Sequence, residues 1–118
     1  MDFFGIGETT KVFLFGSATD MRKGINGLCG LVKNDMGLRV FSGDLFVFIN
    51  KQRNLMKVLY WSSGGLNLFH KRLERGTFKR PSSQENALSC ELFKEEFYMI
   101  LHGIDFEKTK KRKRYLLS

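Results

Sequence analysis

The stretch LFVFINKQRNLMKVLYW, residues 45–61, contains two apolar runs separated by four polar residues. The first run, 45–50, is almost unbroken, which is typical of a strand buried on both faces. The second run, 55–61, also has strand character, and the polar residues between the runs suit a short turn. Residues 45–61 therefore predict two neighbouring antiparallel strands.

Shorter apolar runs on either side extend this sheet. KVFLF at 11–15 predicts one strand, and LNLFHKRLE at 66–74 predicts another after a turn at 62–65. Residues 77–80 predict a brief edge strand that ends before Pro81. The expected sheet is antiparallel and has about four to five strands.

Two main helices are expected to flank this sheet, which gives an α+β fold. Apolar residues recur at helical spacing over 21–36, with Asp20 as the N-cap and Gly37 as the stop. A similar pattern over 87–102 predicts a second helix with Leu88, Leu92, Phe93, Met99 and Ile100 facing inward. Glycines 24, 27 and 30 lie along one side of the first helix, which indicates a close approach to the sheet.

The length of 118 residues suits one domain. We expect a flexible arm at 1–10, one α+β domain at 11–104 that includes a linker at 81–86, and a basic tail at 105–118. The start of the chain does not resemble a signal peptide, and no run is long enough to span a membrane. Cys29 and Cys90 are expected to be free thiols in a reducing compartment. The expected protein is cytoplasmic and has no membrane partner.

The net charge of +8 is unevenly distributed. Between Lys51 and Arg80 there are eight cations and a single acid, Glu74, whereas the second predicted helix is acidic. Such segregation favours a face that binds a phosphate-rich partner. The alternative is the ordinary solvated surface of a basic protein.

Two segments supply the candidate phosphate contacts. KRLERGTFKR at 71–80 is dense in cations, and TDMRKG at 19–24 places two more in the first turn of the predicted helix, where they oppose the helix dipole. A bound phosphate would explain cations at that position. The predicted nucleic-acid-binding residues are Arg22, Lys23, Lys71, Arg72, Arg75, Lys79 and Arg80. The nearby aromatic residues Tyr60, Trp61, Phe69 and Phe78 either lie among these cations or belong to the core.

Little in the sequence favours catalysis. His70 and His102 are interpreted as structural or solvated, and the carboxylates are scattered rather than grouped as metal ligands. A Walker loop and a dinucleotide-binding glycine motif are both absent. No cofactor and no metal are expected.

Four motifs occur in an order and spacing that resemble a known family. They are DMRKGINGL (20–28), FSGDLFVFIN (41–50), LYW (59–61) and GLNLFHKRLERGTF (65–78), with a weaker echo in LHGID (101–105). Together they resemble the TnpB, or second-open-reading-frame, protein of the insertion-sequence-66 class of bacterial mobile elements. This accessory protein is encoded beside the transposase and differs from the RNA-guided nuclease that shares the TnpB label.

The resemblance covers roughly residues 11–81 and implies an accessory role in DNA transposition. The matching positions are Asp20, Met21, Arg22, Lys23, Gly24, Phe48, Trp61, Gly65, Lys71, Arg72, Leu73, Glu74 and Gly76. One position departs from the family pattern, because members usually carry an aspartate directly after the tryptophan and this chain has Ser62. If that aspartate were catalytic in the family, this chain would lack it.

The predicted function is a non-catalytic accessory protein that binds DNA at the element ends, or a transposase–DNA complex, through a basic rim. The cognate transposase is the second expected partner. These contacts would position the DNA rather than read its sequence, because no segment looks like a recognition helix. One alternative is an adaptor that docks the transposase without touching DNA, through a sheet edge or the acidic helix. A metal-dependent nuclease is the third hypothesis.

Overall fold

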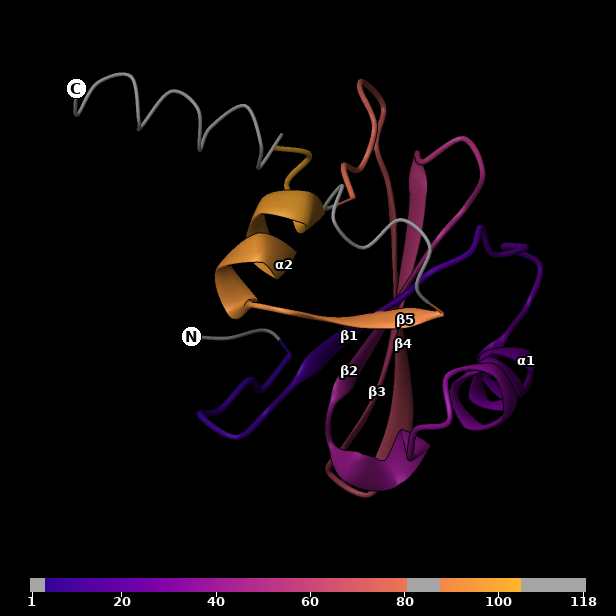
Figure 1. Ribbon diagram of the computed structural model, residues 1–118, viewed down its shortest axis with the longest axis vertical. Coiled ribbons are helices and arrows are strands. Elements are labelled where there is room, and N and C mark those ends of the chain that lie inside the picture. The colour runs from indigo at the N-terminus through magenta and orange to yellow at the C-terminus, as the bar shows by residue number, and fades with distance from the viewer. Residues whose placement is uncertain (1–3, 81–87, 105–118) are drawn as a thin grey trace.

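A computed structural model describes residues 4–80 and 88–104. A five-stranded sheet with the order β4-β3-β2-β1-β5 lies between two helical layers, as Figure 1 shows. The strands are β1 (Val12–Phe15), β2 (Leu45–Ile49), β3 (Leu55–Ser62), β4 (Gly65–Arg72) and β5 (Ser89–Leu92). The helical elements are α1 (Ile25–Gly30), the π-helix η1 (Leu31–Asp35), the 3₁₀-helix η2 (Val40–Ser42) and α2 (Lys94–Leu101). The α+β class is confirmed.

The central strand β2 is buried along its whole length, as its unbroken apolar sequence predicts. Its side chains alternate between two cores because successive residues of a strand point to opposite faces. Leu45, Val47 and Ile49 belong to the core on the α2 side, and Phe46 and Phe48 belong to the core on the α1 side. One short segment thus supplies both cores.

The sheet is mixed, so the prediction of a purely antiparallel sheet is wrong. Strands β2, β3 and β4 form the predicted antiparallel meander. However, β1 pairs with β2 in parallel, with Val12 opposite Leu45. The physical reason is the crossover through α1 and η1, which returns the chain to the end of the sheet at which β1 begins, so that β2 starts there too.

The first helix begins later than the sequence pattern suggests. Gly24 is the N-cap of α1 and provides no side-chain cap. The predicted cap, Asp20, instead accepts hydrogen bonds from the main-chain N–H and guanidinium of Arg22. Arg22 and Lys23 therefore precede the helix and do not lie in its first turn, so they do not oppose its dipole there. Gly37, at φ +67°, follows η1 and Met36 as the predicted stop.

The predicted close approach of the helix glycines to the sheet is also wrong. A β-carbon built on Gly24 meets nothing within 4 Å, and one on Gly27 meets only the Lys23 side chain, at 3.2 Å. Both residues are exposed, because the buried side of α1 and η1 carries Leu28 and Val32. These glycines face away from the sheet.

The predicted second helix is a strand followed by a shorter helix. Residues 89–92 form β5, in which Cys90 and Leu92 are buried on either side of exposed Glu91. Two residues expected to face inward, Leu88 and Phe93, are 66% and 75% exposed. The edge of the sheet beside β1 is β5, and residues 77–80 form no strand.

The described start of the chain packs against the core on the α2 side. Phe4 is 5% exposed, and its ring contacts those of Tyr60, Phe69 and Phe97 with centroid distances of 5.2–5.5 Å. Phe78 is fully buried in the same core. The predicted linker at 81–86 and tail at 105–118 lie outside the described residues. Helices in the described part of the chain lack the length and apolar character needed to cross a bilayer.

Candidate nucleic-acid interface

Three segments that are far apart in the sequence meet at one edge of the sheet. Residues 16–24 follow β1, residues 50–54 connect β2 to β3, and residues 73–80 follow β4. Main-chain hydrogen bonds join the segments, since Leu73 donates to Asn54 at 2.8 Å and Phe78 donates to Arg53 at 2.7 Å. Figure 1 shows the connections after β2 and β4 at the upper end of the molecule.

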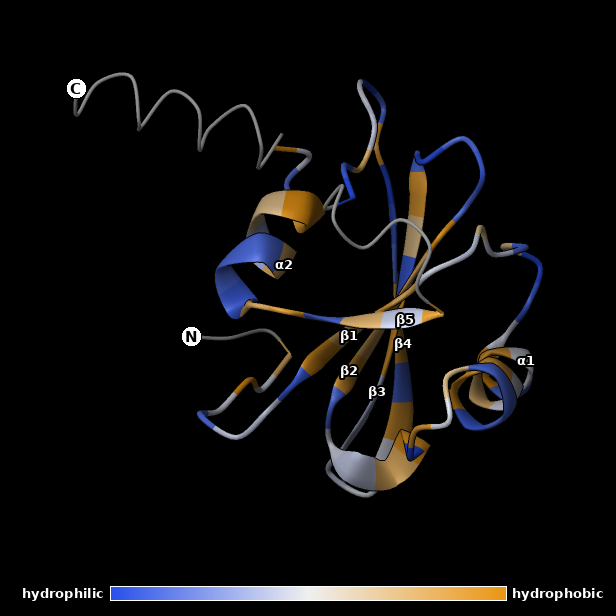
Figure 2. Cartoon of the chain, viewed as in Figure 1, coloured by the Kyte–Doolittle hydropathy of each residue, from blue (hydrophilic) through white to orange (hydrophobic). Residues whose placement is uncertain are grey.

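This edge collects positive charge. The three segments carry seven cations, the last residue of β4, Arg72, adds an eighth, and the acids are Asp20 and Glu74. We define the basic edge as Arg22, Lys23, Lys51, Arg53, Arg72, Arg75, Lys79 and Arg80. Hydrophilic residues dominate the turn between β2 and β3 in Figure 2, whereas the strands are largely apolar.

The opposite end of the strands has the reverse balance. Its described segments carry six acids, Glu8, Asp35, Asp44, Glu91, Glu95 and Glu96, and four cations, Lys11, Lys33, Arg39 and Lys94. The charge segregation seen in the sequence thus becomes a separation along the strand direction. The electrostatic field of this charge separation attracts a polyanion to the basic edge and repels it from the opposite end.

Two predicted contacts, Arg22 and Arg72, form ion pairs with nearby carboxylates. Arg22 lies 2.7 Å from Asp20, and Arg72 lies 3.0 Å from Glu74. Hydrogen bonds from the Arg22 guanidinium and main-chain N–H lower the pKa of Asp20 to about 2, so this carboxylate is ionised at neutral pH. The two arginine side chains are 92% and 65% exposed. Exposed pairs contribute about 0–1 kcal/mol, so each guanidinium can exchange its carboxylate for a phosphate.

Two other predicted contacts, Lys71 and Arg80, are bound by main-chain carbonyl groups. Lys71 Nζ donates to the Leu101 oxygen at 2.7 Å, at the carboxyl end of α2, where a cation is favoured. Its ammonium group is therefore directed toward α2, on the face of the sheet opposite Arg72, since Lys71 and Arg72 point to opposite faces of β4. Arg80 donates to the carbonyl oxygens of Gly16 and Ser17 at 2.9 and 3.3 Å.

The remaining predicted contacts, Lys23, Arg75 and Lys79, have side chains with no hydrogen bond or ion pair within residues 4–80 and 88–104. Lys51 and Arg53 share this property and add to the predicted set. Both belong to the cation-rich stretch from Lys51 to Arg80, but no local pattern indicates that they lie beside the other two segments. None of these five cations forms an ion pair with a described carboxylate, although the charge of Lys23 contributes to lowering the pKa of Asp20.

Lys57 is a positioning residue that sequence analysis missed. It is only 8% exposed on β3, and its ammonium group donates to the carbonyl oxygens of Met21 and Lys23 at 2.7 and 2.8 Å. These bonds hold the segment before α1 against the sheet. The available signal was a single cation inside the apolar run at 55–61.

Lys57→Met should loosen this segment while keeping most of the side-chain volume. We expect the free energy of unfolding to fall by about 1–3 kcal/mol, because two carbonyl groups lose their donor. The main-chain amides of Arg22 and Lys23, which donate to Asp20, should exchange hydrogen faster. Amide exchange followed by NMR measures this change, with His102 after α2 as the control; unchanged exchange at Arg22 and Lys23 would contradict the positioning role.

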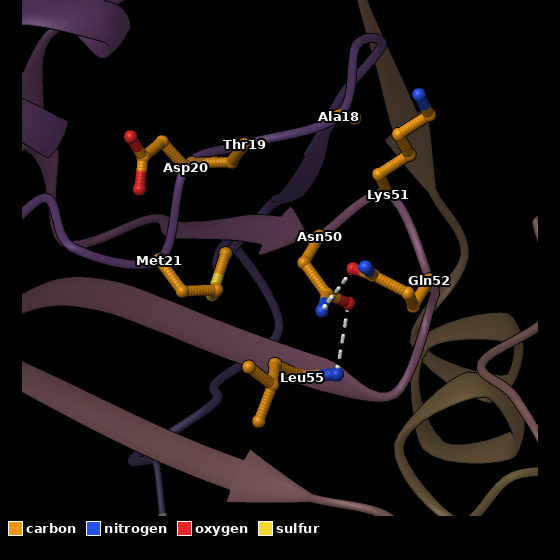
Figure 3. Close-up of a pocket in the computed structure, with 8 residues that line it drawn as sticks. All are labelled: Ala18, Thr19, Asp20, Met21, Asn50, Lys51, Gln52 and Leu55. Atoms are coloured by element: carbon orange, nitrogen blue, oxygen red, sulfur yellow. Dashed lines mark hydrogen bonds between the residues drawn. The ribbon is translucent and has the colours of Figure 1, made fainter.

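Two neighbouring hollows lie at the basic edge. The larger has a volume of about 360 Å³ and is lined by the residues in Figure 3: Ala18, Thr19, Asp20, Met21, Asn50, Lys51, Gln52 and Leu55. The smaller has a volume of about 200 Å³ and is lined by Gly16, Ala18, Asn50, Lys51, Arg53 and Arg80. The Asn50 side chain closes the turn by accepting hydrogen bonds from the N–H groups of Asn54 and Leu55 at 3.0 and 2.9 Å.

Groups suited to catalysis are placed as follows. Among the described residues, no three His, Cys, Asp or Glu side chains come close enough to hold a metal ion together. Ser62, which replaces the aspartate expected from the family pattern, pairs with Gly65 at the β3–β4 turn, the end of the sheet opposite the basic edge. His70 is exposed on β4, and His102 is the C-cap of α2.

Comparisons with known proteins agree with the motifs. The IS66 Orf2 like protein family matches residues 10–111. Two proteins from Sinorhizobium fredii (strain NBRC 101917 / NGR234) are similar along most of their length: uncharacterized protein y4jC is 31% identical over 102 residues, 86% of each chain, and uncharacterized protein y4hO is 37% identical over 101 residues, 85% of each chain. No solved structure matches. The chain therefore belongs to the IS66 Orf2-like family, which is associated with transposition of insertion sequences.

Proposed function

We propose that this protein is a non-catalytic accessory factor in transposition that binds DNA at the element ends, alone or together with the transposase. The observation that supports this most directly is the convergence of three separate segments on one edge, where eight cations face two acids. Phosphate groups spaced along a DNA backbone are the natural partner for such an edge.

The proposed contacts are graded by their surroundings. Lys23, Arg75 and Lys79 form no ion pair with a described carboxylate and contact phosphates directly, together with Lys51 and Arg53. Arg22 and Arg72 exchange carboxylates for phosphates, and Arg80 contributes from the smaller hollow. Lys71 makes no phosphate contact itself, because its ammonium group is bound to the Leu101 carbonyl oxygen; its role is to hold the end of β4 in position.

Contacts of this kind position DNA without reading its sequence. The helix nearest the basic edge, α1, has six residues, and two of these are glycines. Such a helix offers few side chains to base edges, so sequence choice would come from the transposase.

A second candidate function is docking of the transposase without DNA contact. The observation that favours it is Phe93, which is 75% exposed between β5 and the acidic first turn of α2. An exposed aromatic ring beside carboxylates suits a basic protein partner.

Salt titration separates these two functions. With six or more phosphate contacts, a plot of log affinity against log salt should have a slope of about −5 or steeper on a short duplex. Fluorescence anisotropy measures this slope. A flat slope, or no binding in low salt, would overturn the DNA proposal and leave the docking function. Cleavage of the duplex by the pure protein with Mg²⁺ would instead support a nuclease.

A further inference from the structure

We infer that the two hollows at the basic edge form a site for one unpaired nucleotide of a DNA strand. The phosphate of this nucleotide lies among Lys51, Arg53 and Arg80. Its base occupies the larger hollow, beside Met21, Asn50 and Leu55. The site rests on the proposed DNA binding and specifies which form of DNA the edge prefers.

The smaller hollow has the charge expected of a phosphate subsite. Three of its six lining residues are cations, and none is an acid. Burial and the nearby positive charge of Arg53 lower the pKa of Arg80, so the two guanidinium groups repel each other electrostatically. The carbonyl groups of residues 15–17 hold the Arg80 side chain in place. An anion between these like charges relieves their repulsion and gains charge-assisted hydrogen bonds.

The main-chain conformation of Arg53 supports this assignment. Its φ angle is +59°, in the left-handed region that residues with a β-carbon rarely adopt. The Arg53 N–H donates to the Asn50 oxygen at 3.1 Å, and its carbonyl accepts from Phe78, so both neighbours maintain the conformation. A turn selected for stability alone would carry glycine or asparagine here. An arginine at this position indicates a use for its charge.

The larger hollow has the mixed character of a base-binding pocket. Figure 3 shows the Met21 and Leu55 side chains beside the amide groups of Asn50 and Gln52. Apolar side chains can cover the face of a base while the Gln52 amide bonds to its edge. The Asn50 amide is already bonded to Gln52, Asn54 and Leu55, so it shapes the wall of the hollow. Thr19 also lines this hollow; it is 5% exposed, and its hydroxyl group has no partner among the described residues. This hydroxyl oxygen is closed off from the hollow, so contact with a base would fall to Met21, Leu55 and the Gln52 amide.

The arrangement of the hollows indicates an unpaired nucleotide. They share Ala18, Asn50 and Lys51, so a phosphate in one is adjacent to a base in the other. A base that is paired and stacked in a duplex cannot enter such a hollow unless it leaves the helix. Single-stranded extensions or frayed ends present bases that are already free.

The test compares a blunt duplex with a duplex that has a single-stranded extension and the same number of phosphates. The wild-type protein should bind the extended DNA about tenfold more tightly, the usual scale for one stacked base. Ala18→Phe should abolish this preference by filling the shared wall, while blunt-duplex affinity falls by no more than the roughly tenfold expected for loss of the Arg80 contact. Asn34→Phe, on the exposed side of η1, is the matched control and should keep the preference.

Arg53→Gly provides a second variant that does not depend on filling the hollow. It should weaken binding to both DNAs, and to extended DNA about tenfold more than to blunt DNA because the unpaired nucleotide loses a phosphate contact, while the melting temperature stays equal or rises because glycine accepts the positive φ. Deoxyadenosine monophosphate and inorganic phosphate should compete only weakly with the extended DNA. Competition by either one as strong as by an oligonucleotide would reassign the site to a free ligand and overturn the inference.

The failures of the two proposals are distinguishable. If the wild-type protein binds blunt and extended DNA equally with a steep salt slope, the nucleotide site is wrong and the proposed function stands. The same conclusion follows if Ala18→Phe keeps the preference. If neither DNA binds in low salt, the proposed function is wrong, and the nucleotide site that rests on it is wrong as well.

Discussion

Replacing Lys23, Arg75 and Lys79 together with glutamine is expected to weaken binding to a blunt duplex about 1,000-fold at roughly 50 mM salt. Their side chains have no partner among the described residues, so their charges are free to meet phosphates. Each lost contact makes the slope of log affinity against log salt shallower by about 0.9. Between 1 M salt and about 50 mM, a change of that size in slope amounts to a loss of roughly tenfold in affinity for each contact. Anisotropy titrations at several salt concentrations measure both the affinity and the slope.

The matched control changes the same net charge at the other end of the strands. Lys11, Lys33 and Arg39 replaced together with glutamine should reduce affinity only a few-fold, through the weakened overall field. Both triple variants should melt near the wild-type temperature, because exposed cations contribute little to stability. Equal losses in the two variants would show that net charge alone drives binding, and the basic edge would then have no special role.

Phe78→Ala is expected to lower the free energy of unfolding by about 3–5 kcal/mol. The ring is fully buried in the core on the α2 side, and the Phe78 N–H donates to Arg53 at 2.7 Å. A loss of this size is a large part of the roughly 5–15 kcal/mol that holds a typical domain folded. Urea denaturation followed by circular dichroism measures it.

Phe78 also connects stability to binding, because it anchors the segment that carries Arg75, Lys79 and Arg80. Under conditions where Phe78→Ala is still folded, its DNA affinity should therefore be lower than that of the wild type. Phe41→Ala is the control: this ring is 65% exposed and contacts Trp61 at the other end of the sheet. The Phe41 variant should lose about 1 kcal/mol or less and bind DNA normally. Similar stability losses at both positions would contradict the anchoring role of Phe78.

Local sequence patterns were sufficient for the middle of the fold. Strands β2, β3 and β4 are apolar runs bounded by turn residues, and pairing through two short turns leaves little freedom in how they associate. The α+β class and the cation-rich segments were likewise readable, because each depends on residues within one stretch of chain.

Local sequence patterns could not predict β5 or the start of α1, because both depend on residues far away in the chain or on competing side chains. The four residues of β5 are too few to establish a strand period, and they form a strand because β1 offers an unpaired edge. The start of α1 was mistaken because Arg22 competes with the helix for the carboxylate of Asp20. Both outcomes depend on which groups are within reach in the folded chain.

Local patterns in the chain are enough to establish the α+β class and the concentration of positive charge in a few short segments. Three further features depend on how the chain folds: these segments share one edge, Arg53 and Arg80 border one hollow, and the buried Lys57 ammonium group supports residues 21–23. The physical reason is strand direction: the parallel pairing of β1 with β2 brings residues 16–24 to the same end as residues 50–54 and 73–80. Had β1 run the other way, its following segment would lie among the carboxylates at the opposite end.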